Sequence, residues 1–152
     1  MPIDKWNKLV GDEIVGNAGQ EFGTSLDMSE SGNAIIVGTP MEDYGDKKSQ
    51  AGSVWVYVRD NVSGKTRWLV KGNIIYGDSA NDNDLFGASV VIHDDGKIIA
   101  VGFPGHDVGD NIDAGAVTVY EYEAAYDTWL QMQDKMVGTS TLGTFWFLFG
   151  NF

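Results

Sequence analysis

The stretch Phe86-Gly87-Ala88-Ser89, followed fifteen residues later by Gly102-Phe103-Pro104, decides the fold. The same pattern occurs earlier in the chain, as Phe22-Gly23-Thr24-Ser25 followed by Gly38-Thr39-Pro40, and the two copies stand 64 positions apart without a gap. A repeat of fixed period predicts architecture better than any single motif does. We therefore expect two structurally equivalent units.

The repeat extends beyond this centre. A Gly-x-Val-x-Val-Tyr segment occurs at residues 52–57 and again at 115–120, at an offset of 63. Tryptophans recur with nearly the same period at Trp6, Trp68 and Trp129, which predicts a packing role, and a third Phe-Gly pair stands at Phe149-Gly150. The expected division is an outer strand of a preceding unit (1–15), a first unit (16–76), a second unit (77–138), and the truncated start of a third repeat with an aromatic tail (139–152).

Phe-Gly, Gly-x-Pro and Gly-x-Val-x-Val-Tyr, in this order, resemble the FG-GAP repeats of the integrin-α type of β-propeller. The tryptophan-centred spacer is similar to that of FG-GAP proteins of microalgae and bacteria. The resemblance covers residues 6–138 and departs from the family at the middle alanine of Gly-Ala-Pro, where Thr39 and Phe103 stand. It implies two four-stranded antiparallel propeller blades plus flanking strands, in an incomplete ring, because a propeller needs about four to eight blades. A β-sandwich of about eight strands is the alternative.

Composition agrees with an all-β fold. The chain has 20 glycines and no long apolar pattern of helical period, and its short apolar runs are separated by turn residues. A type I′ turn is expected at Asp95-Gly96, and a polar loop at residues 60–66. The expected strands are 8–14, 22–28, 34–38, 53–59, 68–75, 86–92, 97–102, 116–122 and 129–137.

Charge and cysteine content narrow the partners. The net charge of −12 makes nucleic acid an unsuitable partner, because phosphate binding needs a basic surface. The sequence contains no cysteine, which excludes disulfides and thiolate chemistry. It has no apolar run of about 18 residues, so we expect no membrane insertion. No signal peptide is visible at the first residues, while the resemblance favours an extracellular, cell-surface or lumenal location.

The sequence does not predict an enzyme. It contains none of the common catalytic motifs. Its two histidines, His93 and His106, are expected in loops at opposite ends of the strands. A surface histidine is the simpler interpretation of each.

The loops that follow Pro40 and Pro104 share one end of the expected blades with the connections between blades, and this rim is strongly acidic. By resemblance to integrins, it is also the end that binds ligands. We expect a non-enzymatic binding or adhesion module that recognises a protein or a glycan there. Ordinary loop packing of the aromatic residues is the alternative. The candidate ligand-binding residues are Glu42, Asp43, Tyr44, Asp46, Tyr76, Phe103 and His106.

Calcium is the candidate cofactor. The short turns at residues 29–33 and 93–97 lack the alternating carboxylates of the family's calcium loops, so that site is not carried over. Two other acidic loops could supply oxygen ligands for a hard cation, although solvated acidic loops are the commoner explanation. Asn61 begins a glycosylation sequon in an expected exposed hairpin. The candidate calcium ligands are Asp78, Asp82, Asp84, Asp107, Asp110 and Asp113.

The number of blades suggests a second function class. Two blades leave open sheet edges and apolar faces, which invite pairing with another chain. The chain would then be a structural subunit of a larger assembly, completed by a protein partner or by self-association. The apolar tail at residues 144–152 is expected to be buried, in the chain's own core or in an interface.

Overall fold

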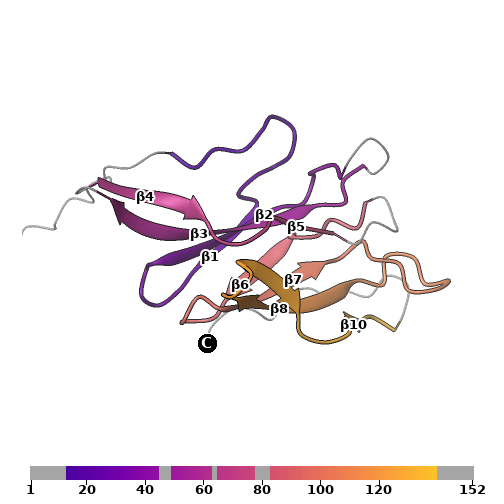
Figure 1. Cartoon of the computed structure of the whole chain (residues 1–152). Coiled ribbons are helices and arrows are strands. Elements are labelled where there is room, and N and C mark those ends of the chain that lie inside the picture. Colours follow the sequence, from indigo (N-terminus) through magenta and orange to yellow (C-terminus); the bar gives the residue numbers. More distant parts are fainter. Residues whose placement is uncertain (1–12, 45–48, 63–64, 78–82, 140–152) are drawn as a thin grey trace, which may run out of the picture.

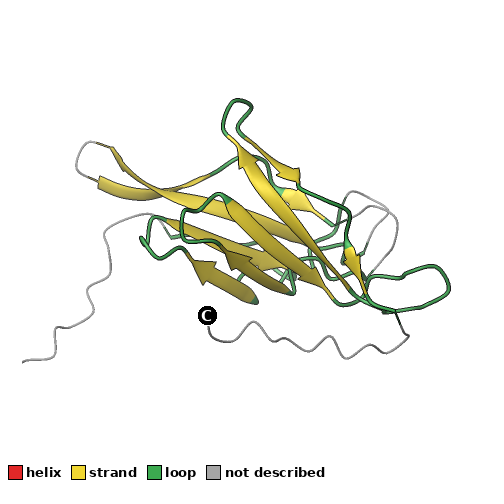
Figure 2. Ribbon diagram, turned by 90° about the horizontal axis from the view of Figure 1, so that it is seen from below, coloured by secondary structure: helices red, strands yellow, loops and turns green. Residues whose placement is uncertain are grey.

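The computed structural model describes residues 13–44, 49–62, 65–77 and 83–139. In these residues the chain is all-β and forms two antiparallel sheets that face each other without closing into a ring (Figures 1 and 2). The expected all-β class is therefore confirmed, and the described strands form two antiparallel sheets of five strands each. The leading piece 1–12, with Trp6, and the tail from residue 140, with the third Phe-Gly, lie outside the described residues.

The first sheet has the order β1-β2-β3-β4, with β5 also paired to β3. β4 and β5 pair with successive parts of β3 and so share the fourth position of the sheet. The expected continuous strand over residues 68–75 is wrong, because Gly72 adopts a positive φ of 73° between these two pieces that L side chains rarely adopt. The strands are β1 (Ser25–Met28), β2 (Ala34–Thr39), β3 (Ser53–Val62), β4 (Lys65–Val70) and β5 (Ile75–Tyr76).

The second sheet repeats this plan, with β6, β7 and β8 in order and with β9 and β10 sharing the fourth position. The register repeats as well: Ser25 pairs with Gly38 in the first sheet, and Ser89 pairs with Gly102 in the second. The expected strand over residues 129–137 is thus also divided. The strands are β6 (Ser89–Ile92), β7 (Ile98–Phe103), β8 (Ala116–Glu123), β9 (Thr128–Gln131) and β10 (Met136–Val137).

Two turns differ from expectation. In the turn after β6 only Gly96 has a positive φ, of 67°, and its N–H donates to the carbonyl of His93. A type I′ turn needs positive φ at both central residues, so that prediction is wrong. The loop expected at 60–66 is largely strand, since β3 continues to Val62 and β4 begins at Lys65.

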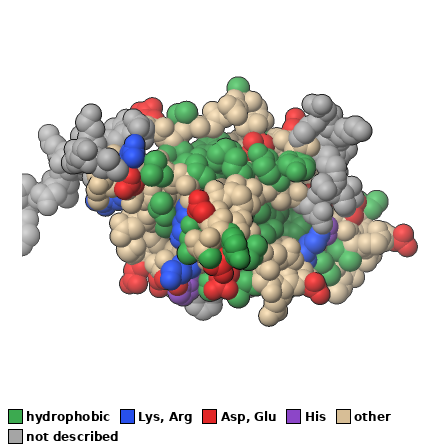
Figure 3. Space-filling view, viewed as in Figure 1, with side chains coloured by type: hydrophobic (Ala, Val, Ile, Leu, Met, Phe, Trp, Pro, Cys, Tyr) green, Lys and Arg blue, Asp and Glu red, His purple; other side chains and the backbone are tan. Residues whose placement is uncertain are grey.

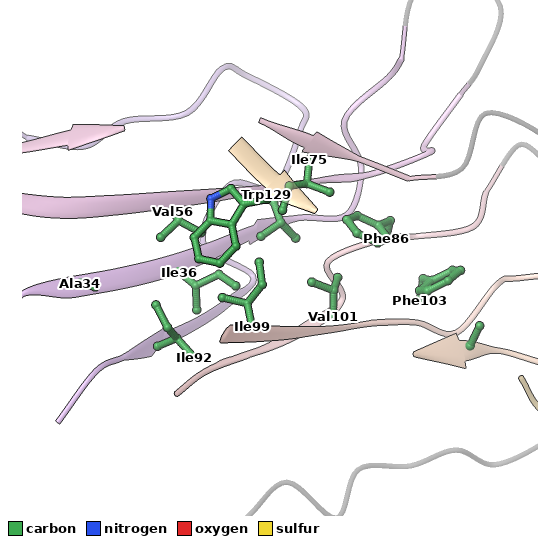
Figure 4. Packing of buried hydrophobic residues seen from close by; sticks show 12 residues of the cluster. Ala34, Ile36, Val56, Ile75, Phe86, Ile92, Ile99, Val101, Phe103 and Trp129 are labelled. Carbon is green, nitrogen blue, oxygen red and sulfur yellow. The ribbon is translucent and has the colours of Figure 1, made fainter. Parts of the chain in front are cut away.

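The core lies between the two sheets (Figure 4). The first sheet contributes aliphatic side chains from β2, β3 and β5. The second contributes aromatic as well as aliphatic ones, among them Phe86, Phe103 and Trp129. Trp129 thus has the inter-sheet packing role that its repeat predicted, and its indole N–H donates to the carbonyl of Lys71 at 2.9 Å.

The two sheets do not present equivalent faces to this core. The first sheet buries Ala34, Ile36, Val54 and Val56 there. Their repeat equivalents in the second sheet are Ile98, Ala100, Val117 and Val119, which lie on the outer face and are half-buried. The second sheet instead buries the alternate positions, such as Ile99 and Val101. Side chains alternate between the two faces of a strand. The inner face of the first sheet therefore packs against the face of the second sheet that corresponds to the outer face of the first. We call this arrangement head-to-tail packing.

Candidate functional site

Three connections lie together at one end of the sheets. They are the β2–β3 loop (residues 40–52), the β5–β6 link (77–88) and the β7–β8 loop (104–115), and we call this the loop end. The N–H of Asn83 donates to the carbonyl of Ser49 at 2.9 Å, and the N–H of Gly105 donates to the carbonyl of Asp84 at 3.1 Å. The link is thus hydrogen-bonded to a loop of each sheet, as the predicted rim requires.

Glu42 does not face solvent at the loop end. Its carboxylate is buried and accepts hydrogen bonds from the hydroxyl of Ser53 and, at 3.4 Å, from the indole N–H of Trp55. It also adds to the effect of burial in raising the pKa of Tyr57. Its predicted place among solvent-facing ligand residues is therefore wrong. A carboxylate that accepts from the buried Ser53 and the half-buried Trp55 holds the loop onto β3.

Asp43 and Tyr44 follow it and are exposed. The Asp43 carboxylate accepts the backbone N–H of Gln50 at 2.9 Å, closing the β2–β3 loop on itself. The Tyr44 ring lies 4.7 Å from the ring of Tyr76, centroid to centroid. Two of the predicted ligand-binding aromatics thus meet, from residues 32 positions apart. Asp46 lies outside the described residues.

A buried charge cluster joins the β5–β6 link to the second sheet. The Asp84 carboxylate is fully buried, and one oxygen lies 3.1 Å from Nδ1 of His106. On the other side of the ring, Nε2 lies 3.3 Å from Nζ of Lys135. A neutral imidazole fits this arrangement of neighbours. Its Nδ1–H donates to Asp84, and its Nε2 accepts from the ammonium of Lys135.

Burial raises the pKa of Asp84, while the hydrogen bond and charge of His106 and the charge of Lys135 oppose this rise. The second carboxylate oxygen of Asp84 is buried without a hydrogen-bond partner. This arrangement corrects the prediction for Asp84, because a fully buried carboxylate that faces an imidazole is not an acidic-loop ligand for calcium. His106 is likewise buried, and not a surface histidine.

The remaining calcium candidates do not converge. The Asp107 carboxylate accepts the backbone N–H of Asp113 at 2.9 Å, closing the β7–β8 loop, and Asp110 is exposed. Across the described residues, no three His, Asp or Glu side chains are close enough to hold a metal ion. Asp78 and Asp82 lie outside that part of the chain, so calcium binding there stays a prediction.

A pocket of about 280 Å³ opens between the two sheets beside this cluster. Figure 3 shows the surface hollowed between the sheets, with hydrophobic side chains at the floor. Four aromatic residues and three polar ones line it: Tyr76, Phe86, Phe103, Tyr120, Thr118, Gln131 and Lys135.

The pocket walls are fixed by aromatic packing. The rings of Phe86 and Phe103 lie 5.3 Å apart, and Tyr120 meets Phe86 edge-on at 6.3 Å. Phe103 also contacts the ring of His106 at 4.9 Å. The structure therefore brings together three of the predicted residues, because Tyr76 and Phe103 line the pocket and His106 stands behind it. Phe103 is core rather than exposed rim.

Lys135, Gln131 and Tyr120 were not among the site residues predicted from the sequence. Gln131 and Lys135 come from the broken outer strand, and no motif marks them. Tyr120 closes the Gly-x-Val-x-Val-Tyr segment, which predicted a strand and no more. Asn61 lies in β3, where its side-chain oxygen accepts the hydroxyl of Thr66 at 2.7 Å; glycosylation there stays a prediction.

Comparison with protein-family models and with curated proteins found no match for this chain. Among the described residues no helix is long and apolar enough to cross a membrane. The site has therefore to be interpreted from its own geometry.

Proposed function

We propose that the chain is a non-enzymatic binding module, built from two FG-GAP-type propeller blades, that recognises a neutral hexose unit of a glycan in the pocket between its sheets. The observation that carries the proposal is the lining of that pocket. Four aromatic side chains line it together with an amide, a hydroxyl and an ammonium group. Binding pockets generally combine apolar walls with a few polar groups that fix orientation.

The blade assignment is supported by the repetition of backbone detail. Both sheets have the same strand order and a fourth position shared by two strands. The residues with positive φ also recur at the repeat offset: Glu21 with Leu85, Gly23 with Gly87, Gly32 with Gly96, Gln50 with Asp113, and Gly52 with Gly115.

The chemistry of a hexose suits the pocket. One face of a sugar ring carries C–H groups that pack on aromatic rings, while its hydroxyls both donate and accept. Thr118, Gln131 and Lys135 supply an alcohol, an amide and an ammonium group, which together cover both hydrogen-bonding roles. The volume of about 280 Å³ is close to the lower limit of roughly 300 Å³ for small-molecule pockets, which suits a single ring.

The surrounding charge favours a neutral sugar over an acidic one. Asp43, Asp110 and Asp113 are exposed at the loop end, and their field opposes an approaching anion. Asp84 and His106 act on Lys135 rather than on a ligand, since Nε2 of the imidazole faces the ammonium at 3.3 Å. We therefore assign Asp84 and His106 the role of positioning Lys135. For this reason we propose recognition without catalysis.

The test is an NMR titration of the ¹⁵N-labelled chain with methyl glycosides of glucose, galactose and mannose. With about −0.3 kcal/mol per heavy atom over roughly 13 atoms, we expect a Kd of about 1 mM. One of the glycosides should shift the amides of Tyr120, Gln131 and Lys135. Chemical shifts that stay unchanged with all three sugars at about ten times that concentration would refute the proposal.

A pair of glutamine variants makes the test specific. Gln131→Ala removes a pocket amide and should weaken binding roughly tenfold, which corresponds to the loss of about one hydrogen bond to the ligand. Gln133→Ala changes an exposed residue outside the pocket lining and should leave affinity unchanged. Equal effects of the two variants would place the sugar elsewhere.

A further inference from the structure

The ring of Tyr44 stands next to the pocket without lining it. Tyr76 is one of the lining residues, and the Tyr44 ring lies 4.7 Å from the Tyr76 ring, centroid to centroid, at an interplanar angle of 41°. We propose that Tyr44 forms a second sugar subsite, so that the ligand is an oligosaccharide with one hexose unit in the pocket and the adjacent unit on the Tyr44 ring. This inference rests on the proposed function and names the class of its ligand.

Tyr76 is the wall that the two subsites share. It comes from β5 of the first sheet, where it pairs with Ser53. The pocket is therefore bounded on the first-sheet side by the same ring that Tyr44 packs against. Most of the other lining residues belong to the second sheet or to the β5–β6 link, namely Phe86, Phe103, Thr118, Tyr120 and Gln131.

Tyr44 keeps a surface for a ligand after this contact. It is 45% exposed, whereas Tyr76 is half-buried. Tyr126, the other exposed aromatic residue in the part of the chain that the structure describes, lies in the β8–β9 turn and outside the pocket lining. Tyr44 is thus the exposed aromatic residue that extends the aromatic surface of the pocket.

The backbone that precedes Tyr44 is anchored to the other end of its loop. The N–H of Gly52 donates to the carbonyl of Glu42 at 2.9 Å, and the Asp43 carboxylate accepts the N–H of Gln50 at 2.9 Å. A tyrosine ring held in this way offers a large contact area at a small cost in conformational entropy. This favours Tyr44 as a preformed stacking surface.

The size of the pocket requires a further sugar unit to lie outside it. The volume of about 280 Å³ suits a single ring, so the next unit of a glycan has to follow the surface beyond one of the walls. Beside the Tyr76 wall that surface is the ring of Tyr44. A hexose there can pack its C–H face on the ring, as the first hexose does inside the pocket.

The polar groups near Tyr44 suit a second neutral hexose. Burial, the charge of Glu42 and the neighbouring Tyr44 raise the pKa of Tyr76 above its usual value. Its hydroxyl therefore stays protonated at neutral pH and can donate to a sugar hydroxyl or accept from one. The exposed Asp43 adds negative charge beside Tyr44, which opposes an acidic sugar there.

The test compares a monosaccharide with disaccharides in the same NMR titration. The probes are the methyl glycoside that binds in the pocket and the methyl glycosides of the α-linked and the β-linked disaccharide of that hexose. We expect one disaccharide to bind roughly fivefold more tightly, because the second ring buries additional C–H surface, and to shift the amide of Tyr44. If neither disaccharide binds more tightly than the monosaccharide, this inference is overturned and the proposed function still stands.

Variants of Tyr44 separate stacking on a sugar from packing within the loop. Tyr44→Ala should remove the gain in affinity of the disaccharide, while the methyl glycoside of the single hexose still binds. Tyr44→Phe keeps the ring and should retain the gain. Tyr126→Ala removes an exposed aromatic side chain outside the pocket lining and should bind both probes as the wild type does.

Two outcomes identify which proposal has failed. Equal weakening of both probes by Tyr44→Ala would mean that this ring only supports the pocket wall, and it would overturn the second subsite. If none of the methyl glycosides of the single hexoses binds, the proposed function is refuted, and this inference is refuted with it.

Discussion

Replacing Phe86 by alanine should destabilise the chain far more than the same replacement of Phe22, although the two residues are repeat equivalents. Phe86 is 1% exposed, and its ring contacts Phe103 and Tyr120. Phe22 is half-buried and has one described ring contact, edge-on to Trp55 at 6.5 Å. The Phe86 side chain belongs to the core between the two sheets, whereas the Phe22 side chain is partly exposed.

The magnitudes follow from burial. Truncation of a fully buried phenylalanine costs about 3–5 kcal/mol, because a cavity remains. Half-burial of such a side chain is favourable by about half of the roughly 1.5–3 kcal/mol of full burial, so Phe22→Ala should cost about 1 kcal/mol. A domain of this size loses about 2–4 °C in Tm per kcal/mol, which predicts a decrease of at least about 6 °C for Phe86→Ala.

The assay is urea unfolding followed by tryptophan fluorescence, with each substitution compared with the wild-type chain at the same protein concentration. The midpoint and the m-value should be fitted together, because a changed m-value signals a changed unfolded or native state rather than a lost contact. Equal destabilisation by Phe86→Ala and Phe22→Ala would refute the head-to-tail assignment of faces. It would mean that the first sheet buries its Phe-Gly pair as fully as the second does.

Two further predictions concern charged groups that link the two units. Lys71→Met should lower the free energy of unfolding by about 1–2 kcal/mol. The Lys71 ammonium donates to the carbonyl of Gly96 at 2.6 Å and stands over the ring of Tyr122. Thermal melts measure the loss, and the variant Lys97→Met, at an exposed position, is the control that should lose less. Asp84→Asn should change the pH dependence of stability. Burial raises the pKa of Asp84, so the folded state holds its proton more tightly, and the wild type loses stability as pH rises from about 3.9 through the raised pKa. The variant should lack this decrease, and a variant whose unfolding curves change with pH as the wild type's do would contradict the raised pKa.

The strand plan was predictable because the repeat carries it. Strand positions in both units follow from alternation and from turn residues, and the structure confirms most of them within a few residues. The outer end of the β3–β4 hairpin, where β3 continues to Val62 and β4 begins at Lys65, was predicted as a loop because its residues are mostly polar. Its strands are joined by side-chain pairs such as Thr66 with Asn61 and Arg67 with Asp60, and a ribbon with both faces in water needs no apolar pattern.

The site was less predictable because it depends on contacts between distant residues. Asp84 and His106 lie 22 residues apart, and Lys135 lies 29 residues beyond His106. From residue type alone, Asp84 was predicted to lie in an acidic loop and His106 to be a surface histidine. Only the close approach of the β5–β6 link to the β7–β8 loop buries them, and a single sequence does not show which polar residues such an approach covers. The choice of face was hidden for a related reason, since both faces of each strand are apolar.

Comparison of equivalent positions shows which residues leave room for the pocket beside the second sheet. In the first unit Glu42 is held by Ser53 and Trp55, and the large indole packs against the rings of Phe22 and Tyr57. In the second unit the equivalent residues are His106, Ala116 and Thr118. Neither the methyl group of Ala116 nor the small Thr118 can fill that volume, and His106 takes its partner from the link instead. The repeat thus supplies one framework twice, and the small Thr118 at the position equivalent to Trp55 leaves room for the pocket.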